Sequence, residues 1–281
     1  MAFTFETATT ARLDDVVAAV ASWQHDGGSV QVHPGDLGWN WSNGAEKLAA
    51  EVRVWRRDGE AVAVGLVDED SGLVRMALAK TADHDEEIAD RLLADLSSGF
   101  RLVEARFGTA LRHGLARDGW QADEAWAPLV RDLAGPVPEH GLRIEVVGPE
   151  TAGAWVAVHR AAFATSTFSL QRWQRMAASS AFRGARCLLG FDDQDVPVAA
   201  TTVWSAGPGR PGLIEPLGVH RDHRGNGHGV AITRAAASAL QELGSSSARV
   251  CTPSANTGGV AAYGAAGFDR LPDVTDFRRP D

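Results

Sequence analysis

Cysteine and tyrosine are scarce in this chain of 281 residues, which has two of the first and one of the second. Cys187 and Cys251 have neither the close spacing of a zinc site nor the number of a disulfide framework, which favours ordinary buried thiols in a reducing compartment. No stretch reaches the roughly 18 consecutive apolar residues of a membrane helix, and the start, MAFTFETATTARLDD, lacks the basic-then-apolar order of a signal peptide. We therefore expect a cytoplasmic protein without a membrane anchor.

Lys and Arg are fewer than Asp and Glu in the first half. Residues 1–138 contain 23 Asp and Glu against 13 Lys and Arg, whereas residues 139–281 contain 13 against 14. Nucleic-acid binding needs Lys and Arg clustered on one face, so we expect no nucleic-acid partner. A compact anionic ligand would belong to the second half. Alternatively, the net charge of −9 only keeps the protein soluble.

The sequence does contain the same order of elements twice. Residues 135–141 (GPVPEHG) combine two prolines and two glycines between strand-like runs, which is typical of a linker. We predict a first domain over residues 1–135, a linker over 136–141 and a second domain over 142–281, related by an old duplication.

Both halves alternate strands with helices. In the first half, strands are expected near 3–7, 52–66 (a hairpin), 73–79 and 102–107, with helices near 11–23, 86–96 and 109–117. In the second half, strands are expected near 142–147, 187–204 (a hairpin), 213–219, 248–252 and from 267 onward, with helices within 152–178, 229–243 and 257–266. Helices between strands predict an α/β or α+β fold, with a mixed central sheet.

The strongest chemical signal lies at residues 217–230, LGVHRDHRGNGHGV. A strand ends there, and glycines then allow a tight turn whose N–H groups point inward at a helix start, an arrangement that holds a pyrophosphate. Arg221, His223 and Arg224 add positive charge beside the turn. A lone Arg-x-x-Gly-x-Gly match is weak in a chain with 30 glycines, so a plain turn that needs positive φ is the alternative.

This segment resembles the GNAT superfamily of acyl-CoA-dependent N-acyltransferases. The loop RGNGHG (224–229) is similar to the family's pyrophosphate motif, and LGV (217–219) resembles the strand whose backbone pairs with the pantetheine arm. Downstream, Asn256 and then AYGAAGF (262–268) resemble the family's Asn…Leu-Tyr-x-x-x-Gly-Phe segment. The two matches, in this order, cover roughly residues 142–280.

The resemblance implies a mostly antiparallel sheet that splays between its fourth and fifth strands, with acetyl-CoA in the opening and no metal. The residues that it places along acetyl-CoA are Leu217, Gly218, Val219, Arg224, Gly225, Asn226, Gly227, His228, Gly229, Val230, Asn256 and Tyr263.

Two residues are candidates for proton transfer. Tyr263, the one tyrosine, stands where the family has the acid that protonates the CoA thiolate, and a phenol with a pKa near 10 suits that task. Packing against pantetheine is its alternative role. Glu215 is our candidate general base, on the same strand face as Leu217 and Val219, and Pro216 indicates an irregular strand. A surface salt bridge is the alternative for Glu215.

Other candidates are weaker. Related enzymes have a Glu on the next strand, where this chain has Val250 and Cys251. Asn256 also suits a helix N-cap. The loop residues His220, His223 and His228 fit phosphate-side donors or solvated side chains, and no pairing of His with Glu indicates a metal.

The first half lacks the glycine loop. In its place stands KTADHDEE (80–87), with four acids at a predicted helix start, which would cap the helix themselves and repel a pyrophosphate. We therefore expect this half not to bind CoA. Its segment 35–42 (GDLGWNWS) is predicted as a structural loop, with a place over the acceptor site or in an interface as the alternative.

These observations lead to one functional hypothesis with two alternatives. The hypothesis is a tandem GNAT protein with a degenerate first copy, which transfers an acetyl group from acetyl-CoA to a primary amine of a small molecule or peptide by direct attack in a ternary complex. The tandem layout is similar to that of mycothiol synthases, which acetylate a cysteinyl sugar amine. A non-catalytic CoA-binding module is the other alternative, and a homodimer is left open.

Overall fold

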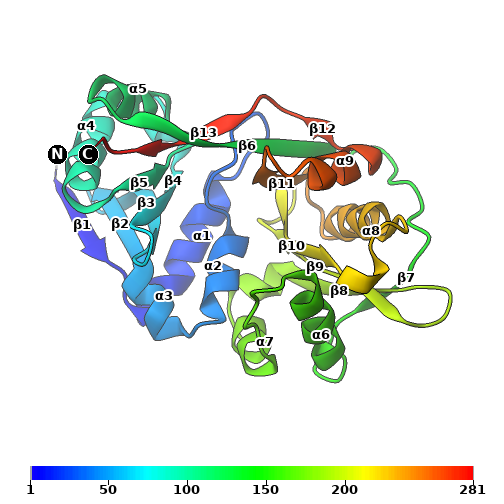
Figure 1. Cartoon of the computed structure of the whole chain (residues 1–281). Helices are drawn as coiled ribbons and strands as arrows, with labels where there is room; N and C mark the ends of the chain where they lie inside the picture. Colours follow the sequence, from blue (N-terminus) through cyan, green and yellow to red (C-terminus); the bar gives the residue numbers. More distant parts are fainter. Residues whose placement is uncertain (1, 281) are drawn as a thin grey trace.

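The strands of the computed structural model, which describes residues 2–280, pair into one mixed sheet flanked by helices (Figure 1). The strands are β1 (Phe3–Thr7), β2 (Val52–Arg57), β3 (Glu60–Asp68), β4 (Leu73–Leu78), β5 (Leu102–Glu104), β6 (Gln121–Asp132), β7 (Arg143–Val146), β8 (Ala185–Phe191), β9 (Pro197–Ser205), β10 (Gly212–Val219), β11 (Ser247–Pro253), β12 (Asp269–Arg270) and β13 (Val274–Arg278). The α-helices are α1 (Leu13–Trp23), α2 (Pro34–Trp41), α3 (Ala45–Glu51), α4 (Glu86–Gly99), α5 (Thr109–Arg117), α6 (Ala152–Ala162), α7 (Leu170–Ala177), α8 (His228–Glu242) and α9 (Thr257–Ala265).

The two halves repeat one strand order. In the first half, β1 to β4 pair antiparallel in sequence and β5 then joins β4 in parallel. In the second half, β7 to β10 do the same and β11 joins β10 in parallel. The expected mixed sheet and the repeat of elements are therefore confirmed.

The halves are joined through β6 and β13, which run between them (Figure 1). Strand β6 pairs along residues 126–132 with β11 of the second half. Strand β13, near the C-terminus, returns to pair with β5 of the first half and with β6. Each half thus depends on a strand from the other, and the division into 1–135, 136–141 and 142–281 stays a prediction.

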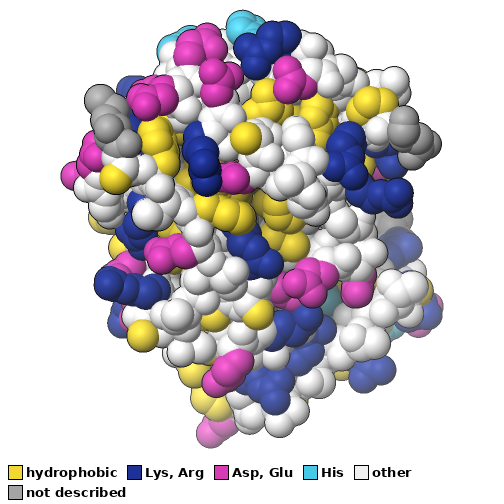
Figure 2. Space-filling model, turned by 90° about the vertical axis from the view of Figure 1, so that its left-hand side faces the viewer, with side chains coloured by type: hydrophobic (Ala, Val, Ile, Leu, Met, Phe, Trp, Pro, Cys, Tyr) yellow, Lys and Arg dark blue, Asp and Glu magenta, His cyan; other side chains and the backbone are white. Residues whose placement is uncertain are grey.

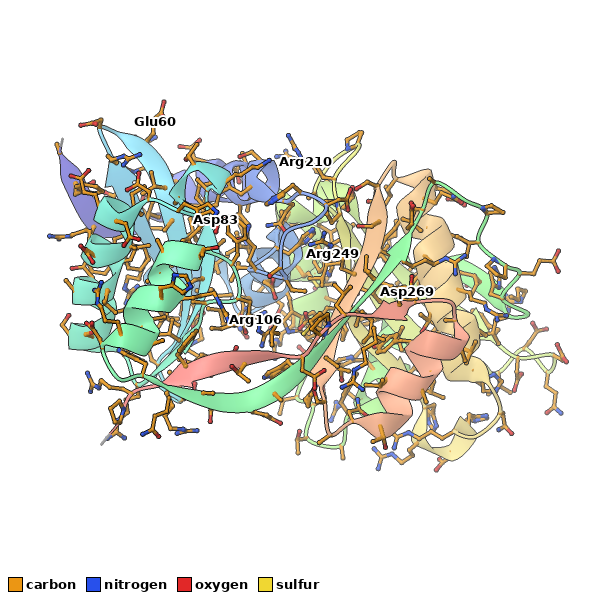
Figure 3. The ribbon with its side chains drawn as sticks, turned by 90° about the horizontal axis from the view of Figure 1, so that it is seen from above. Glu60, Asp83, Arg106, Arg210, Arg249 and Asp269 are labelled. Atoms are coloured by element: carbon orange, nitrogen blue, oxygen red, sulfur yellow. The ribbon has the colours of Figure 1, made fainter. Side chains whose placement is uncertain are left out.

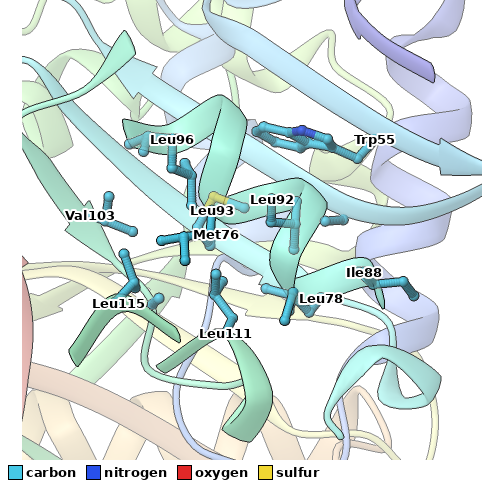
Figure 4. Close-up of a cluster of buried hydrophobic side chains, with 14 of the residues drawn as sticks. Trp55, Met76, Leu78, Ile88, Leu92, Leu93, Leu96, Val103, Leu111 and Leu115 are labelled. Atoms are coloured by element: carbon cyan, nitrogen blue, oxygen red, sulfur yellow. The ribbon is translucent and has the colours of Figure 1, made fainter. Parts of the chain in front are cut away.

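The core of the first half shows why its helices form where the spacing predicts them. Helix α4 has its apolar side chains at Ile88, Leu92 and Leu96, one turn apart, and turns them toward Trp55 and Met76 of the sheet (Figure 4). Burying such side chains contributes roughly 1.5–3 kcal/mol each.

The end of the first half carries both signs of charge. Figure 2 shows Lys and Arg side chains interspersed with Asp and Glu around a patch of apolar side chains on this face. No single-sign patch dominates the visible surface, and the absence of a nucleic-acid partner stays a prediction. Among the helices of residues 2–280, none has the length and apolarity needed to cross a membrane.

Segment 35–42 corrects one expectation, because it lies in helix α2 rather than in a loop. The His33 ring accepts from the N–H of Gly35, the Asp36 carboxylate accepts from the N–H of His33, and Pro34 fills the first helical position. Helix α2 lies at the interface of the halves: a Cβ on Gly35 would come within 2.5 Å of the Trp204 ring of β9. The interface alternative is thus confirmed.

The contact between His33 and the second half predicts acid sensitivity. The buried ring donates from Nε2 to the carbonyl of Pro211 (3.2 Å), and burial lowers the pKa of His33 to about 4. Because the folded pKa lies below the unfolded value of about 6.5, this group stabilises the fold fully above pH 6.5, and about 3 kcal/mol is lost as the pH falls toward 4.

We expect His33→Asn, which retains a capping oxygen but does not titrate, to melt at a lower temperature than wild type at pH 7.5 and to lose less stability on acidification. Thermal melts across this pH range measure the slope. His159, whose pKa burial also lowers to about 4, supplies a residual slope in both proteins. An unchanged slope in the variant would show that His33 does not carry the effect.

Candidate active site

The fourth and fifth strands of the second half separate, as expected for a splayed sheet. Strands β10 and β11 pair only at Gly212 with Ala248 and at Leu213 with Arg249, and then diverge. Beyond Leu213, the residues of β10 therefore have a strand partner only on the β9 side within the described chain. The opposite edge of Leu217–Val219 is left for a ligand that pairs with backbone groups.

A bulge in β10 marks the start of this opening. The register with β9 shifts between Ile214 and Leu217, which confirms the irregularity expected from Pro216. Trp204 Nε1 donates to the carbonyl of Glu215 (2.7 Å), and Thr201 Oγ1 donates to that of Pro216 (2.8 Å). Side chains thus satisfy the two carbonyls that the bulge removes from the ladder, which fixes the position of Glu215.

The glycine loop presents unused N–H groups at the start of α8. Gly225 and Gly227 have φ of +83° and +80°, and a Cβ on either would meet open space. Within residues 2–280, the N–H groups from Gly225 to Val230 have no hydrogen-bond acceptor. No side chain caps α8, and its first turn has no acid. Free N–H groups and the positive end of the helix dipole form an anion site of the kind that holds a pyrophosphate.

The corresponding helix of the first half is already capped. Asp85 Oδ1 accepts from the N–H of Ile88 at 3.0 Å, and Glu86 and Glu87 fill the first turn of α4. The expectation that acids cap this helix is confirmed. That the first half does not bind CoA stays a prediction.

The loop arginines hold helix α6. Arg224 Nη2 donates to the carbonyl of Ala162 (2.8 Å), and Arg221 Nε donates to that of Ala161 (3.0 Å). Their charge lies beside the loop as expected, but these donors satisfy the last carbonyls of α6. Gly218 serves the same packing, because a Cβ there would lie 2.5 Å from the Ala162 Cβ.

The remaining loop side chains make local contacts. Asn226 Nδ2 donates to the carbonyl of His223 (3.3 Å), and the His220 ring accepts from the N–H of Asp222 (3.3 Å). His228 is the first residue of α8. Roles for these side chains at phosphate stay predictions.

Helix α9 carries Asn256 at its N-cap and Tyr263 on its buried face. Asn256 Oδ1 accepts from the N–H of Gly259 (3.1 Å) and Nδ2 donates to Thr252 Oγ1 (2.9 Å), so the N-cap alternative is confirmed. The Tyr263 ring lies 6.1 Å from that of Phe268. The Tyr263 hydroxyl makes no hydrogen bond to any residue in 2–280. Burial and the charge of Glu215 raise its pKa, so the phenol stays protonated and able to donate.

Glu215 lies on β10, near charged residues of the first half. Its side chain is exposed to water, yet the surrounding protein raises its pKa to about 7 through loss of hydration and the charge of Asp36. Glu104 raises this pKa further, while Arg75 and Arg106 oppose the rise. Its carboxylate forms no ion pair with any described residue, so the salt-bridge alternative is not supported. A carboxyl group with a pKa near neutrality suits a general base.

The residues that surround Glu215 come from the first half, and the sequence analysis missed them. Arg75 of β4 bonds Asp36 of α2 (Nη1 to Oδ1, 2.8 Å) and Glu104 of β5 (Nε to Oε2, 3.0 Å). Arg106, which follows β5, lies where the ribbons of the two halves meet (Figure 3). A usable signal was present, since charged residues interrupt the apolar strands LVRMAL and LVEARF.

A large hollow lies elsewhere. It has a volume of about 860 Å³ and is lined by the loop 26–30 and by residues of β6, of the segment 245–249 and of the segment 269–274. None of the predicted site residues lines it. The site is therefore assigned on the strand opening, the loop N–H groups and the positions of Glu215 and Tyr263.

A splayed sheet with an uncapped glycine loop at its open end is the arrangement that the sequence resemblance implied. Residues 154–268 match the model of the acetyltransferase (GNAT) family. The second half of the chain thus contains a GNAT acetyltransferase domain, which makes the protein a transferase.

Solved structures extend the likeness to the whole chain. A GCN5-related N-acetyltransferase from Sphaerobacter thermophilus is 17% identical, with a TM-score of 0.56, over 99% of this chain and 95% of that one. A tandem GNAT protein from the clavulanic acid biosynthesis pathway is 14% identical, with a TM-score of 0.55, over 98% of each chain. A GNAT-family acetyltransferase from Colwellia psychrerythraea is 13% identical, with a TM-score of 0.56, over 99% of each. The chain therefore has a tandem GNAT fold. No curated protein matches the sequence.

Proposed function

We propose that the protein transfers the acetyl group of acetyl-CoA to a primary amine of a small molecule or peptide, by direct attack in a ternary complex. The observation that carries the proposal is the row of unpartnered N–H groups from Gly225 to Val230, adjoining the unpaired edge of Leu217–Val219. The row suits a pyrophosphate, and the strand edge suits the amide groups of a pantetheine arm. The glycines leave open space where side chains would block the phosphates.

Two side chains would move the protons, Glu215 as an ionised carboxylate and Tyr263 as a protonated phenol. Glu215, with a pKa near 7, accepts the proton of the attacking amine directly or through water, while the protonated Tyr263 donates to the departing thiolate. A C–N bond forms as the C–S bond breaks, so one proton is taken up and one is given. Glu215 lies on β10 and Tyr263 on α9, so the two side chains come from the two sides of the strand opening. This arrangement suits an acetyl-CoA thioester and an amine that are held together in one orientation.

Several expectations stay proposals. We propose a cytoplasmic location and a reaction without metal, for a monomer or a homodimer. The tandem layout alone does not favour a cysteinyl sugar amine over other amines as the acceptor.

Calorimetry with acetyl-CoA tests the location of the site. We expect one molecule per chain, and an affinity at least about tenfold lower after Gly227→Glu with Gly229→Glu, because bulky carboxylates would fill and repel the phosphate position. Gly99→Glu with Gly135→Glu adds the same charge at two glycines that also face open space, and it should bind normally. Two sites per chain, or unchanged binding by the loop variant, would disprove the assignment.

A further inference from the structure

Five charged side chains form a connected set between the two halves, which we name the charged ladder. Its members are Asp36, Arg75, Glu104, Arg106 and Asp276. Beyond the two bonds of Arg75, Arg106 Nη2 lies 3.4 Å from Glu104 Oε2, and Arg106 Nε lies 3.0 Å from Asp276 Oδ1. The side chains of Asp36, Glu104 and Arg106 are less than one-tenth exposed.

The charged ladder has more negative than positive charge. Each of its two guanidinium groups lies between two carboxylates, so three carboxylates share two cations. Glu104 Oε2 takes contacts from both arginines, while Glu104 Oε1 is buried and has no hydrogen-bond partner within residues 2–280. Leaving a buried carboxylate oxygen unsatisfied is costly, and proteins retain such groups mostly where function needs them.

The charged ladder lies near the predicted base, because four of its members act on the pKa of Glu215. Arg106 Nη1 donates to Cys251 Sγ of β11 at 3.5 Å, so a single guanidinium separates Glu104 from Cys251. Leu213 and Arg249 form the last pair between β10 and β11, and Glu215 and Cys251 each lie two residues beyond it on the two diverging strands. Glu104 of the N-terminal half thus lies near Glu215 of the C-terminal half, close enough for its charge to raise the pKa of Glu215.

We propose that the acceptor amine carries a second positively charged group, held by the surplus negative charge of the ladder around Glu104 while the reacting amine meets Glu215. This inference rests on the proposed acetyl transfer. An acceptor of this class is a diamine, or an amine beside another cation. An acceptor with a carboxylate at the same distance would add a further negative charge to a space that already holds an excess, and is disfavoured.

The test compares three acceptors of similar length with saturating acetyl-CoA: 1,4-diaminobutane, butylamine and 4-aminobutanoate. Release of the CoA thiol gives kcat/KM for each. We expect the diamine to exceed butylamine by at least about tenfold and 4-aminobutanoate to be the poorest. Raising the salt from about 0.05 to about 0.5 M should reduce the advantage of the diamine over butylamine, because the diamine carries the larger charge.

Glu104→Gln removes the surplus charge and leaves an amide of the same shape. In this variant the diamine should fall to the level of butylamine, mainly through KM. Because Glu104 also raises the pKa of Glu215, the acceptors are compared at a pH well above the pKa of Glu215, where its carboxylate is ionised in both proteins. Glu6→Gln is the matched control, because Glu6 also pairs with an arginine, Arg56 at 3.0 Å, but at an exposed strand far from the opening. It should retain the wild-type order of acceptors.

The outcomes separate the two hypotheses. Wild-type turnover that is as fast with butylamine or 4-aminobutanoate as with the diamine overturns the inference and leaves acetyl transfer standing. The ranking of the three acceptors is measured on the wild-type protein. It therefore tests the inference even if Glu104→Gln does not fold. Binding of acetyl-CoA without thiol release for any of the three amines overturns the proposed transfer to small amines and, with it, this inference.

Discussion

Glu215→Gln is expected to lower kcat/KM for the amine by about 10²–10⁴ at neutral pH, the range usual for loss of a general base, and to change the KM for acetyl-CoA much less. The amide keeps the size of the side chain and the bulge of β10, whose carbonyls are bonded by Trp204 and Thr201. The variant therefore removes proton acceptance while the shape of the opening is retained.

The pH profile is the sharper measurement. Loss of hydration and the charges of Asp36 and Glu104 raise the pKa of Glu215 to about 7, so the wild-type rate should rise from pH 6 to pH 8 as the carboxylate forms. In Glu215→Gln this step should be lost, leaving only the rise caused by deprotonation of the amine in solution. Glu145→Gln, at a half-buried position of β7, should keep the wild-type profile. An unchanged rate and profile in Glu215→Gln would place the base elsewhere.

Much of the second-half site could be predicted because its signals are local. The glycines at 225 and 227 adopt positive φ in the structure, and Asn256 caps the helix that carries Tyr263. The turn, the cap and the helix spacing each depend on residues a few positions apart, and those interactions are visible in the sequence. The contrast between the two helix starts, one capped by Asp85 and the other uncapped, is local in the same way.

The electrostatics of the site could not be predicted because they depend on distant segments. Asp36, Arg75 and Glu104 meet only after α2, β4 and β5 have packed beside β10. Even α2 was missed, because its short and glycine-containing sequence has little helical propensity. It forms where Gly35 and Gly38 allow close contact with Trp204, so tertiary packing decides its structure. The pairing of β6 with the second half and of β13 with the first could not be predicted either, because it also depends on tertiary packing.

Tyr263→Phe is expected to lower kcat roughly 10- to 1000-fold, the range usual for loss of a positioned proton donor, and to change CoA binding by less than about 1 kcal/mol. The phenylalanine ring keeps the packing against Phe268 and removes only the hydroxyl, which has no hydrogen-bond partner in residues 2–280. Because burial and Glu215 raise the pKa of Tyr263, its ionisation should not limit the rate between pH 6 and pH 9.

Tyr263→Leu separates the hydroxyl from the ring. This variant also loses the aromatic packing of a residue that is 8% exposed, so it should lower the melting temperature and weaken CoA binding, which Tyr263→Phe should not do. Steady-state kinetics with the true acceptor, together with calorimetry of CoA, distinguish the two effects. Full turnover by Tyr263→Phe would mean that the phenol is a packing residue, and the thiolate would then leave without a proton from this side chain.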